Sequence, residues 1–228
     1  MTYQRARQVL PRWLLRHIYH FESVIADEVQ RFSAGLPDGA RVLDAGAGES
    51  RHAAVFPRQR YTGIDLAVGD PSWNYRRLDA LADLERLPFS SHCFDAALMI
   101  VTIEHLKRPG AALAEIARVL RQGARLLVVA PHQWEVHQAP HDYFRYTRYG
   151  LEFLLSEAGF EVTALEPAGG LFRLLSRRLL AGVTLMPIWL KPAALLAFLP
   201  MAVILPLFDR FDARRDYTLG YSCMATKR

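Results

Sequence analysis

The feature that most constrains the fold is an alternation of short apolar runs with stretches of helical periodicity. Each run has the length and composition of a buried strand, and a longer segment separates it from the next. Such β–α alternation predicts a doubly wound α/β fold, with a mostly parallel sheet and helices on both faces. The expected strands are RVLDAG (41–46), RYTGID (60–65), FDAALMI (94–100), RLLVVA (125–130) and FEVTALEP (160–167), and the expected helices lie near 49–56, 110–121 and 148–158.

Both ends of the chain depart from this alternation. Residues 8–34 carry apolar residues at helical spacing, which predicts a helix that stops at Gly35. Residues 216–227, DYTLGYSCMATK, alternate in the manner of an edge or antiparallel final strand. We therefore expect four parts, namely an N-terminal helical cap (1–34), a core (35–167), an apolar, basic helical insert (168–215) and the final core strand (216–228).

Composition bounds the class of protein. The 228 residues are 51% hydrophobic and 22% charged, which suits one packed domain with an elaboration and excludes a disordered chain. The net charge of +5 permits an anionic partner, but no nucleic-acid-binding motif is recognisable, so we do not expect nucleic-acid binding. Cys93 and Cys223 are too few for a disulfide framework, and no secretory signal is visible, because Arg5, Arg7 and Arg12 interrupt the opening segment. A cytoplasmic location is expected.

The insert leaves three alternatives open. Residues 192–208 carry no charge, but they are shorter than the roughly 20 residues of a membrane span, and Pro200 and Pro206 interrupt them, so a straight transmembrane helix is not expected. Residues 1–21 and 168–208 both contain basic residues and no acid. The insert could cover the active site as a lid, form the interface of a homodimer, or rest on an anionic membrane surface at the inner face of the membrane.

The segment VLDAGAGES (42–50) carries the clearest chemical signal. A strand runs into Asp44, and Gly46 and Gly48 then let the backbone turn sharply and approach a ligand closely. Arg51 stands where the dinucleotide fingerprint needs a third glycine, which disfavours a pyrophosphate, and the Asp44 carboxylate suits a cation. Asp65 ends the next strand, where a carboxylate can accept hydrogen bonds from both ribose hydroxyls. These residues predict a positively charged nucleoside ligand without a pyrophosphate.

Taken together, the motifs of residues 38–166 and the final strand resemble the class I S-adenosylmethionine-dependent methyltransferases, in particular the small-molecule, type 11-like group. The resemblance implies a seven-stranded Rossmann-like sheet with an antiparallel last strand and methyl transfer from S-adenosylmethionine. VLDAGAG is similar to the first motif and GIDL to the second, RLDALADLERLPF to the adenine-binding segment, FDAALMIVTIEHLKRP to the fourth strand and its loop, and EIARVLRQGARLLVVAP to the helix and fifth strand.

Carried over residue by residue, the resemblance assigns a cofactor site. It departs from the family at Ser50, which replaces the usual third glycine, and after Asp79, where a longer stretch makes Asp83 a rival for the adenine contact. The alternative is that Asp65 and Asp79 are only solvated carboxylates at strand ends. The implied contacts are Asp44, Gly46, Ala47 and Gly48 with the methionine portion, Asp65 and Leu66 with the ribose, Asp79 and Ala80 with the adenine, and the backbone near Val101 and Thr102 with the amino acid end.

The loop PHQWEVHQAPHDYFRYT (131–147) holds the candidates for acceptor chemistry. Methyl transfer needs orientation of donor and acceptor, and it needs a base only where the acceptor must lose a proton. We expect His141, His137 or His105 as base or orienting group, and His132, Tyr143 and Arg145 at the acceptor, with Arg145 alternatively pairing with Asp142 to fix the loop. A metal is not expected, because the histidine spacing matches no standard helical ligand pair and the resemblance implies none.

These features together predict a methyltransferase that uses S-adenosylmethionine and releases S-adenosylhomocysteine. The acceptor would be small, either amphiphilic or lipid-linked, and would be attacked at oxygen or nitrogen. A catalytically silent protein of the same fold, serving as partner or scaffold, is the alternative from another class. A nicotinamide-dependent oxidoreductase is disfavoured by Arg51 and by Asp44 before the first glycine.

Overall fold

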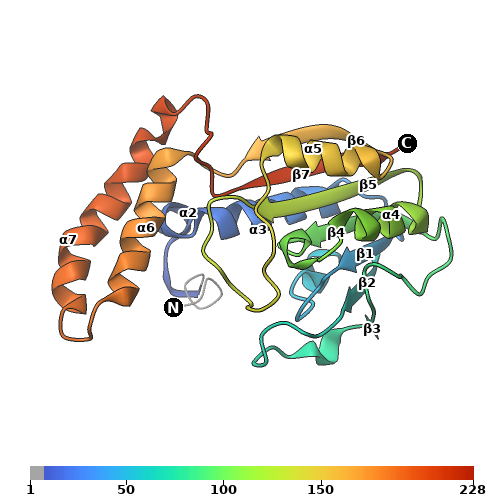
Figure 1. Cartoon of the computed structure of the whole chain (residues 1–228), viewed down its shortest axis with the longest axis horizontal. Coiled ribbons are helices and arrows are strands. Elements are labelled where there is room, and N and C mark those ends of the chain that lie inside the picture. Colours follow the sequence, from blue (N-terminus) through green and yellow to red (C-terminus); the bar gives the residue numbers. More distant parts are fainter. Residues whose placement is uncertain (1–7) are drawn as a thin grey trace. The chain divides into compact units, whose positions relative to one another are not determined.

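A computed structural model describes residues 8–228 (Figure 1). The chain divides into two compact units, which we describe separately. The smaller unit contains the described residues up to Ala26 together with Pro167–Gly220, and the larger unit contains Asp27–Glu166 together with Tyr221–Arg228. The larger unit carries the sheet and every sequence-predicted site residue.

The sheet has seven strands in the order β3-β2-β1-β4-β5-β7-β6 (Figure 1). The first five strands of that order are mutually parallel. Strand β7 runs antiparallel to β6, because Arg228 N donates to Gly159 O at one end while Thr163 Oγ1 donates to Met224 O farther along. The predicted fold class is confirmed. The strands are β1 (Arg41–Ala45), β2 (Arg60–Asp65), β3 (Ala80–Leu81), β4 (Phe94–Ile100), β5 (Leu120–Pro131), β6 (Phe160–Pro167) and β7 (Gly220–Lys227).

Helices cover both faces of the sheet, as predicted. Helices α4 (Pro109–Val119) and α5 (Arg148–Glu157) bury Leu113, Ile116, Leu151 and Leu155 in one core with alternate residues of the central strands. On the other face, helix α3 (His20–Ala34) places the Phe32 ring 5.6 Å from the Arg125 guanidinium of β5. The strand order reverses between β1 and β4, which is where α/β sheets form ligand sites at the carboxyl ends of their strands.

Two local expectations were wrong. The helix expected near 49–56 is only the 3₁₀ turn η1 (Ala53–Val55), because Ser50 adopts a left-handed φ of 53° and Pro57 disfavours helical geometry in the residue before it. The single helix expected over 8–34 is two, α2 (Arg12–Ile18) and α3, separated at Tyr19, whose φ of −112° and ψ of 53° are not helical. Strand β3 has two residues and leaves no periodic signal. Residues 1–7 of the expected cap, with Arg5 and Arg7, lie outside the described residues.

The smaller unit is helical, as expected for the insert. It contains α6 (Leu171–Leu185), α7 (Lys191–Ile204) and the 3₁₀ segment η4 (Leu205–Phe211), together with α2 and the start of α3. Two carboxylates cap the first turn of α6, since Asp209 accepts from Gly170 N at 2.9 Å and Asp212 accepts from Leu171 N at 2.8 Å. This arrangement satisfies free amide groups at the positive end of the helix dipole.

Much of α7 and η4 is exposed. The segment Lys191–Phe211 is long and apolar enough to cross a membrane by length and composition alone, and only 17% of its most apolar window is buried in the structure. Pro200 lies inside α7 and Pro206 in η4. Large apolar side chains of this unit that are at least half exposed include Leu185, Ile188, Trp189, Leu196, Met201, Ile204, Leu207 and Phe211.

Candidate active site

The glycine turn, residues 45–50, begins where β1 ends. Gly46 N and Ala47 N both donate to Ile64 O of β2 at 2.9 Å, and Gly46 has a left-handed φ of 86°. A Cβ atom at Gly46 would lie 2.2 Å from Thr102 Cγ2, so no side chain fits there. Conformation and close packing therefore both require glycine at this position.

Asp44 lies at the base of the glycine turn with an unsatisfied oxygen. Its side chain is buried, and the Tyr61 hydroxyl donates to Oδ2 at 2.5 Å. The other oxygen, Oδ1, is buried without a hydrogen-bond partner in the described part of the chain. Burial raises the pKa of Asp44 to about 7, and the nearby Asp65 charge acts in the same direction. A ligand that brings positive charge or an N–H donor would satisfy this carboxyl group.

Asp65 and Asp79 hold the backbone around the same edge. Asp65 accepts from Gly48 N at 3.0 Å with one oxygen and from Ala67 N at 2.7 Å with the other. Asp79 accepts from Gly63 N at 2.8 Å. A carboxylate oxygen can accept more than one hydrogen bond, so Asp65 keeps capacity for hydroxyl groups of a ligand. Its neighbour Leu66 is half exposed, and the ribose and adenine contacts assigned to this segment, Ala80 included, stay predictions.

Val101 follows β4 at the opposite side of the switch point. It is a β-branched residue with a left-handed φ of 53°, a conformation that such residues rarely adopt. Its N–H donates to Val129 O at 2.8 Å, and the next residue, Thr102, donates from Oγ1 to Gly46 O at 3.2 Å. Backbone strain of this kind collects at ligand sites, which agrees with the cofactor contact predicted for Val101.

Sequence reasoning missed Trp73 beside the glycine turn. Its ring lies 3.0 Å from the position that a Cβ of Gly48 would take, and the Arg51 guanidinium lies 5.8 Å from the centre of that ring. Tyr75 packs against it with ring centres 6.1 Å apart. The only available signal was two aromatic residues in the polar loop that follows Asp65.

The histidine loop, residues 131–147, joins β5 to α5 and is fixed by an ion pair. Two nitrogens of Arg145 donate to the two oxygens of Asp142, at 2.6 and 2.7 Å, and these hydrogen bonds lower the pKa of Asp142 to about 2. Arg145 also donates to Glu135 O at 2.8 Å. These contacts favour the alternative in which Arg145 orders the loop.

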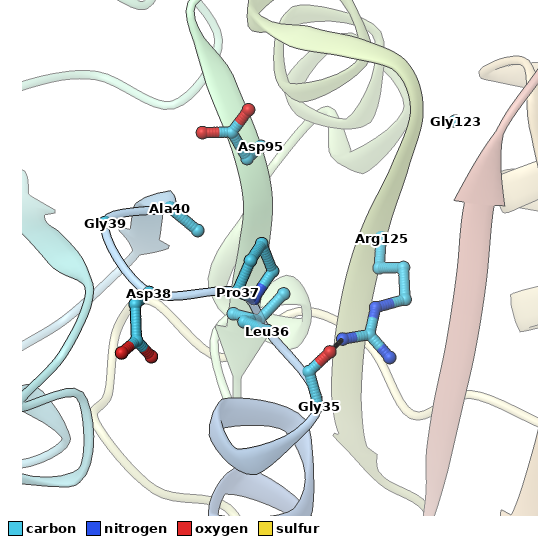
Figure 2. A pocket seen from close by; sticks show the side chains of 9 residues that line it. All are labelled: Gly35, Leu36, Pro37, Asp38, Gly39, Ala40, Asp95, Gly123 and Arg125. Carbon is cyan, nitrogen blue, oxygen red and sulfur yellow. Dashed lines mark hydrogen bonds between the residues drawn. The ribbon is translucent and has the colours of Figure 1, made fainter.

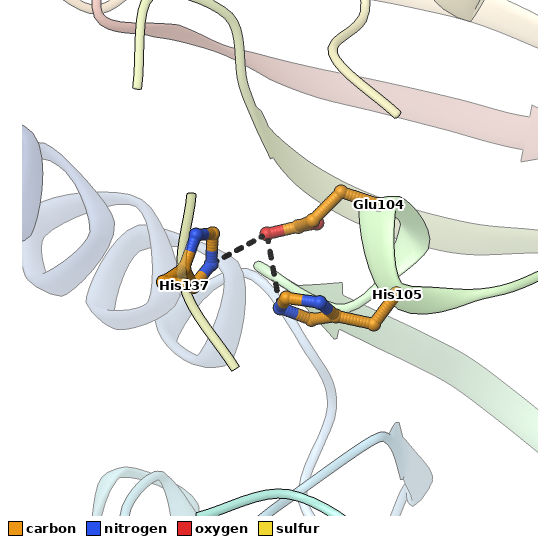
Figure 3. Close-up of side chains that lie close together, drawn as sticks. All are labelled: Glu104, His105 and His137. Atoms are coloured by element: carbon orange, nitrogen blue, oxygen red, sulfur yellow. Dashed lines mark ion pairs between the residues drawn. The ribbon is translucent and has the colours of Figure 1, made fainter. Parts of the chain in front are cut away.

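Two of the four predicted histidines, His105 and His137, lie beside an acidic residue that was not predicted, Glu104. His105 Nδ1 lies 2.5 Å from His141 O, and the rings of His105 and His137 meet edge to face with centres 4.7 Å apart. Both face Glu104, which is fully buried (Figure 3). In the motif IEHL, Glu104 looks the same as a solvated acid beside a histidine, so the sequence offered no signal for it.

The other predicted acceptor-side residues make separate contacts. His141 Nδ1 is 3.2 Å from the Tyr143 hydroxyl, and the Tyr143 ring is more than one-third exposed. The ring of His132 instead packs against Tyr221 of β7, with centres 5.7 Å apart.

A surface hollow lies elsewhere, at the amino ends of the strands (Figure 2). It is lined by residues 35–40 with Asp95, Gly123 and Arg125, and Arg125 donates to Gly35 O. Because ligand sites of α/β sheets form at the carboxyl ends of the strands, this hollow is not the candidate active site.

Known proteins resemble this chain in the same region. A family profile described as "Methyltransferase domain" matches residues 43–128. The malonyl-[acyl-carrier protein] O-methyltransferase of Laribacter hongkongensis is 36% identical over 107 residues, which are 39% of this chain and 36% of that protein. The ubiquinone/menaquinone biosynthesis C-methyltransferase of Rhizobium etli is 36% identical over 94 residues, 39% of this chain and 35% of that protein. The chain thus matches about a third of the length of these two relatives.

Among solved structures, that of the [4+2]-cyclase SpnF has a TM-score of 0.56 and 22% identity, and the match covers 89% of this chain and 80% of that one. This likeness supports the fold alone, and the neighbour's name shows that the fold also hosts other reactions.

Proposed function

We propose that this chain, which belongs to the class I S-adenosylmethionine-dependent methyltransferases, transfers a methyl group to an oxygen or nitrogen of a small acceptor. One observation carries the proposal: the buried Asp44 keeps an oxygen without a hydrogen-bond partner in the described part of the chain, close to Gly46, which admits no side chain, at the switch point of the sheet. This is a site for a cationic ligand that approaches the backbone closely. S-adenosylmethionine supplies positive charge and an electrophilic methyl group when bound.

The residues of the glycine turn would hold the cofactor and orient it. Asp44 would accept from the ammonium group, and the backbone of Gly46 to Gly48 would lie along the methionine portion. Asp65 would accept from the ribose hydroxyls, since its own backbone hydrogen bonds fix the carboxylate in place. Asp79, Ala80 and Leu66 would border the adenine and ribose, and Val101 the amino acid end. Holding donor and acceptor in line is the main work of such a site.

On the acceptor side, we assign His141 and Tyr143 to contact with the acceptor. Their hydrogen-bonding atoms lie 3.2 Å apart, so either one could orient a hydroxyl or amine, and His141 could accept its proton. The Tyr143 and Phe144 rings are each more than one-third exposed, which suits an acceptor with an apolar part.

The test is release of S-adenosylhomocysteine, measured by mass spectrometry, from S-adenosylmethionine and a panel of phenols, carboxylic acids, amines and their long-chain analogues. We expect release above the no-acceptor rate with at least one class, and loss of that release in Asp65→Ala. Binding of the cofactor with no release from any acceptor would favour the silent partner or scaffold.

We also propose that the smaller unit contacts the surface of an anionic membrane from the cytoplasmic side. The support is its cover of exposed apolar residues, including Trp189 at 74% and Leu196 at 80% exposure. The basic residues of this unit should contribute less to membrane binding than the sequence suggested. Arg173 lies 3.4 Å from the Asp209 carboxylate, and Arg177 lies 3.7 Å from the Glu22 carboxylate. Flotation with anionic liposomes tests this proposal. If the protein stays wholly in the soluble fraction and is a dimer, the proposal is wrong, and the same apolar surface binds a second copy of the chain.

A further inference from the structure

Glu104 is an acidic residue buried beside two histidines. Its side chain is fully buried, and neither carboxylate oxygen has a hydrogen-bond partner in the described part of the chain. Nε2 of His105 and Nε2 of His137 each lie 3.6 Å from Oε1 (Figure 3). That separation is too long for a hydrogen bond. A buried carboxylate is costly unless positive charge offsets it, so either the protonated forms of these two histidines or a bound cation must satisfy it.

The tautomers of the two histidines determine what that group can be. His105 Nδ1 lies 2.5 Å from His141 O, and His137 Nδ1 lies 3.1 Å from Glu135 O. A carbonyl oxygen only accepts hydrogen bonds, so each Nδ1 must carry the proton. In the neutral rings each Nε2 then carries a lone pair. Two imidazole lone pairs and a carboxylate therefore converge on one point, which attracts a cation.

Neighbouring residues hold the Glu104, His105 and His137 side chains in position. Asp142 lies behind both rings, with Oδ2 3.5 Å from His137 Nδ1 and Oδ1 4.0 Å from His105 Nδ1, and Arg145 fixes its carboxylate. Asp142 also accepts from His137 N at 2.8 Å. The backbone of Glu104 is fixed as well, because its carbonyl accepts from Tyr143 N at 2.9 Å. A carboxylate behind a histidine ligand is the usual outer partner in protein metal sites.

We propose that Glu104, His105 and His137 form a binding site for a divalent first-row cation of the zinc or manganese type. Their candidate ligand atoms all lie within 4.8 Å of one another. In a tetrahedral zinc site, bonds of about 2.0–2.1 Å place the ligand atoms roughly 3.3 Å apart. The two 3.6 Å separations need only a small adjustment, and the two histidine nitrogens, which lie within 4.8 Å of each other, would move closer together by side-chain rotation. Two imidazoles favour such a cation over magnesium or calcium, which prefer oxygen ligands.

This site would assign His105 and His137 a different role from the base expected from the sequence. Three protein ligands leave a fourth position open, as in zinc sites that bind a water or a substrate oxygen. From the sequence no metal was expected, because the spacing of His132, His137 and His141 matches no standard helical ligand pair. The set proposed here is a different one, and its third ligand is Glu104. The proposal does not depend on methyl transfer, because cation binding is measured directly.

The experiment uses the whole chain, stripped with a chelator and shown by circular dichroism to be folded. It is titrated calorimetrically with Zn²⁺ and, separately, with Co²⁺ while the visible spectrum is recorded. We expect one equivalent to bind with micromolar or tighter affinity, and Co²⁺ to give the absorption of a low-coordinate nitrogen–oxygen site. Glu104→Gln, His105→Ala and His137→Ala should each weaken binding at least tenfold, whereas His17→Gln, which changes a histidine of α2, should not.

Two results would overturn the proposal. One is the absence of stoichiometric Zn²⁺ or Co²⁺ binding by the folded wild-type chain, which needs no variant. The other is binding that persists unchanged in a folded His105→Ala/His137→Ala protein. Histidine NMR separates the competing explanation, since Nε2 protons on both rings would mean that imidazolium groups, and not a metal, satisfy Glu104.

Discussion

The glycine turn and the histidine loop both follow carboxyl ends of parallel strands, but they are held in different ways. Backbone geometry holds the glycine turn, through two N–H groups that share Ile64 O and a contact with Thr102 that leaves no space at Gly46. Charge holds the histidine loop, through the Asp142–Arg145 pair.

The two regions should therefore be sensitive to different substitutions. A turn defined by its backbone should fail when a small side chain is added, even though no functional group is lost. A loop defined by charge should fail when a charged partner is removed, even though the backbone could adopt the same path. Four variants follow. Three of them compare cofactor affinity with stability, and the fourth, Asp44→Asn, follows stability against pH.

Gly46→Ala should have the largest effect. The added methyl group meets Thr102 at 2.2 Å, and alanine must adopt a φ of 86°. Left-handed geometry and overpacking together should lower the free energy of unfolding by about 2–5 kcal/mol and abolish binding of S-adenosylhomocysteine. Urea unfolding and calorimetric titration measure the two effects. Gly110→Ala is the matched control, because its new methyl group meets nothing within 4 Å. Wild-type affinity in Gly46→Ala would show that the turn is not held as described.

Arg145→Ala should come next and affect stability alone. It leaves the Asp142 side chain, only 3% exposed, without two charged hydrogen bonds, which should cost about 2–3 kcal/mol. Thermal or urea unfolding gives the loss, and S-adenosylhomocysteine should bind as tightly as to the wild type. Arg121→Ala removes a more exposed pair with Asp95 and should cost less than about 1 kcal/mol. A loss of cofactor affinity in Arg145→Ala would mean that the two regions are coupled.

The pH dependence of stability tests Asp44. Its pKa is about 7 in the folded chain against 3.8 for an ordinary aspartate, so the unfolded chain loses this proton first as the pH rises. The contribution of Asp44 to stability should therefore be most favourable below about pH 4 and fall toward pH 7, by up to about 1.4 kcal/mol per pH unit. Asp44→Asn removes that slope. Urea midpoints from pH 4 to 7 provide the comparison, and parallel curves for the two proteins would contradict the buried carboxyl group.

Trp73→Ala should have the smallest effect. The ring covers Gly48 and lies near Arg51, so its removal should weaken binding of S-adenosylhomocysteine by less than about tenfold, or under about 1.4 kcal/mol, and change stability little. Trp13→Ala, at an exposed position of α2, is the control and should leave the affinity unchanged. An affinity in Trp73→Ala equal to that of the control would remove Trp73 from the site.

The sequence predicted what depends on neighbouring residues. Strand β1 and the turn at Gly46 could be read from one short segment, because a strand followed by glycines specifies its own backbone path. The helix expected near 49–56 failed because the left-handed Ser50 and the following Pro57 outweighed a weak periodicity.

Contacts between residues far apart in the sequence could not be predicted from local patterns. Glu104 meets His137 from 33 positions away, and nothing local distinguishes it from a solvated acid beside a histidine. The pairing of Asp142 with Arg145 was foreseen as an alternative, because the two residues are only three positions apart. The position of Asp142 behind His105 depends on the meeting of two loops, which periodicity does not describe.

The most direct measurement is a calorimetric titration of the purified chain with S-adenosylhomocysteine, for the wild type and for Asp65→Ala. The account predicts one site of micromolar affinity, weakened about 10–100-fold by the loss of hydrogen bonds to the Asp65 carboxylate, with Asp83→Ala unchanged. No binding by folded wild-type chain free of co-purified cofactor, or equal affinity in Asp65→Ala, would contradict the claim that the glycine turn and the end of β2 hold the cofactor.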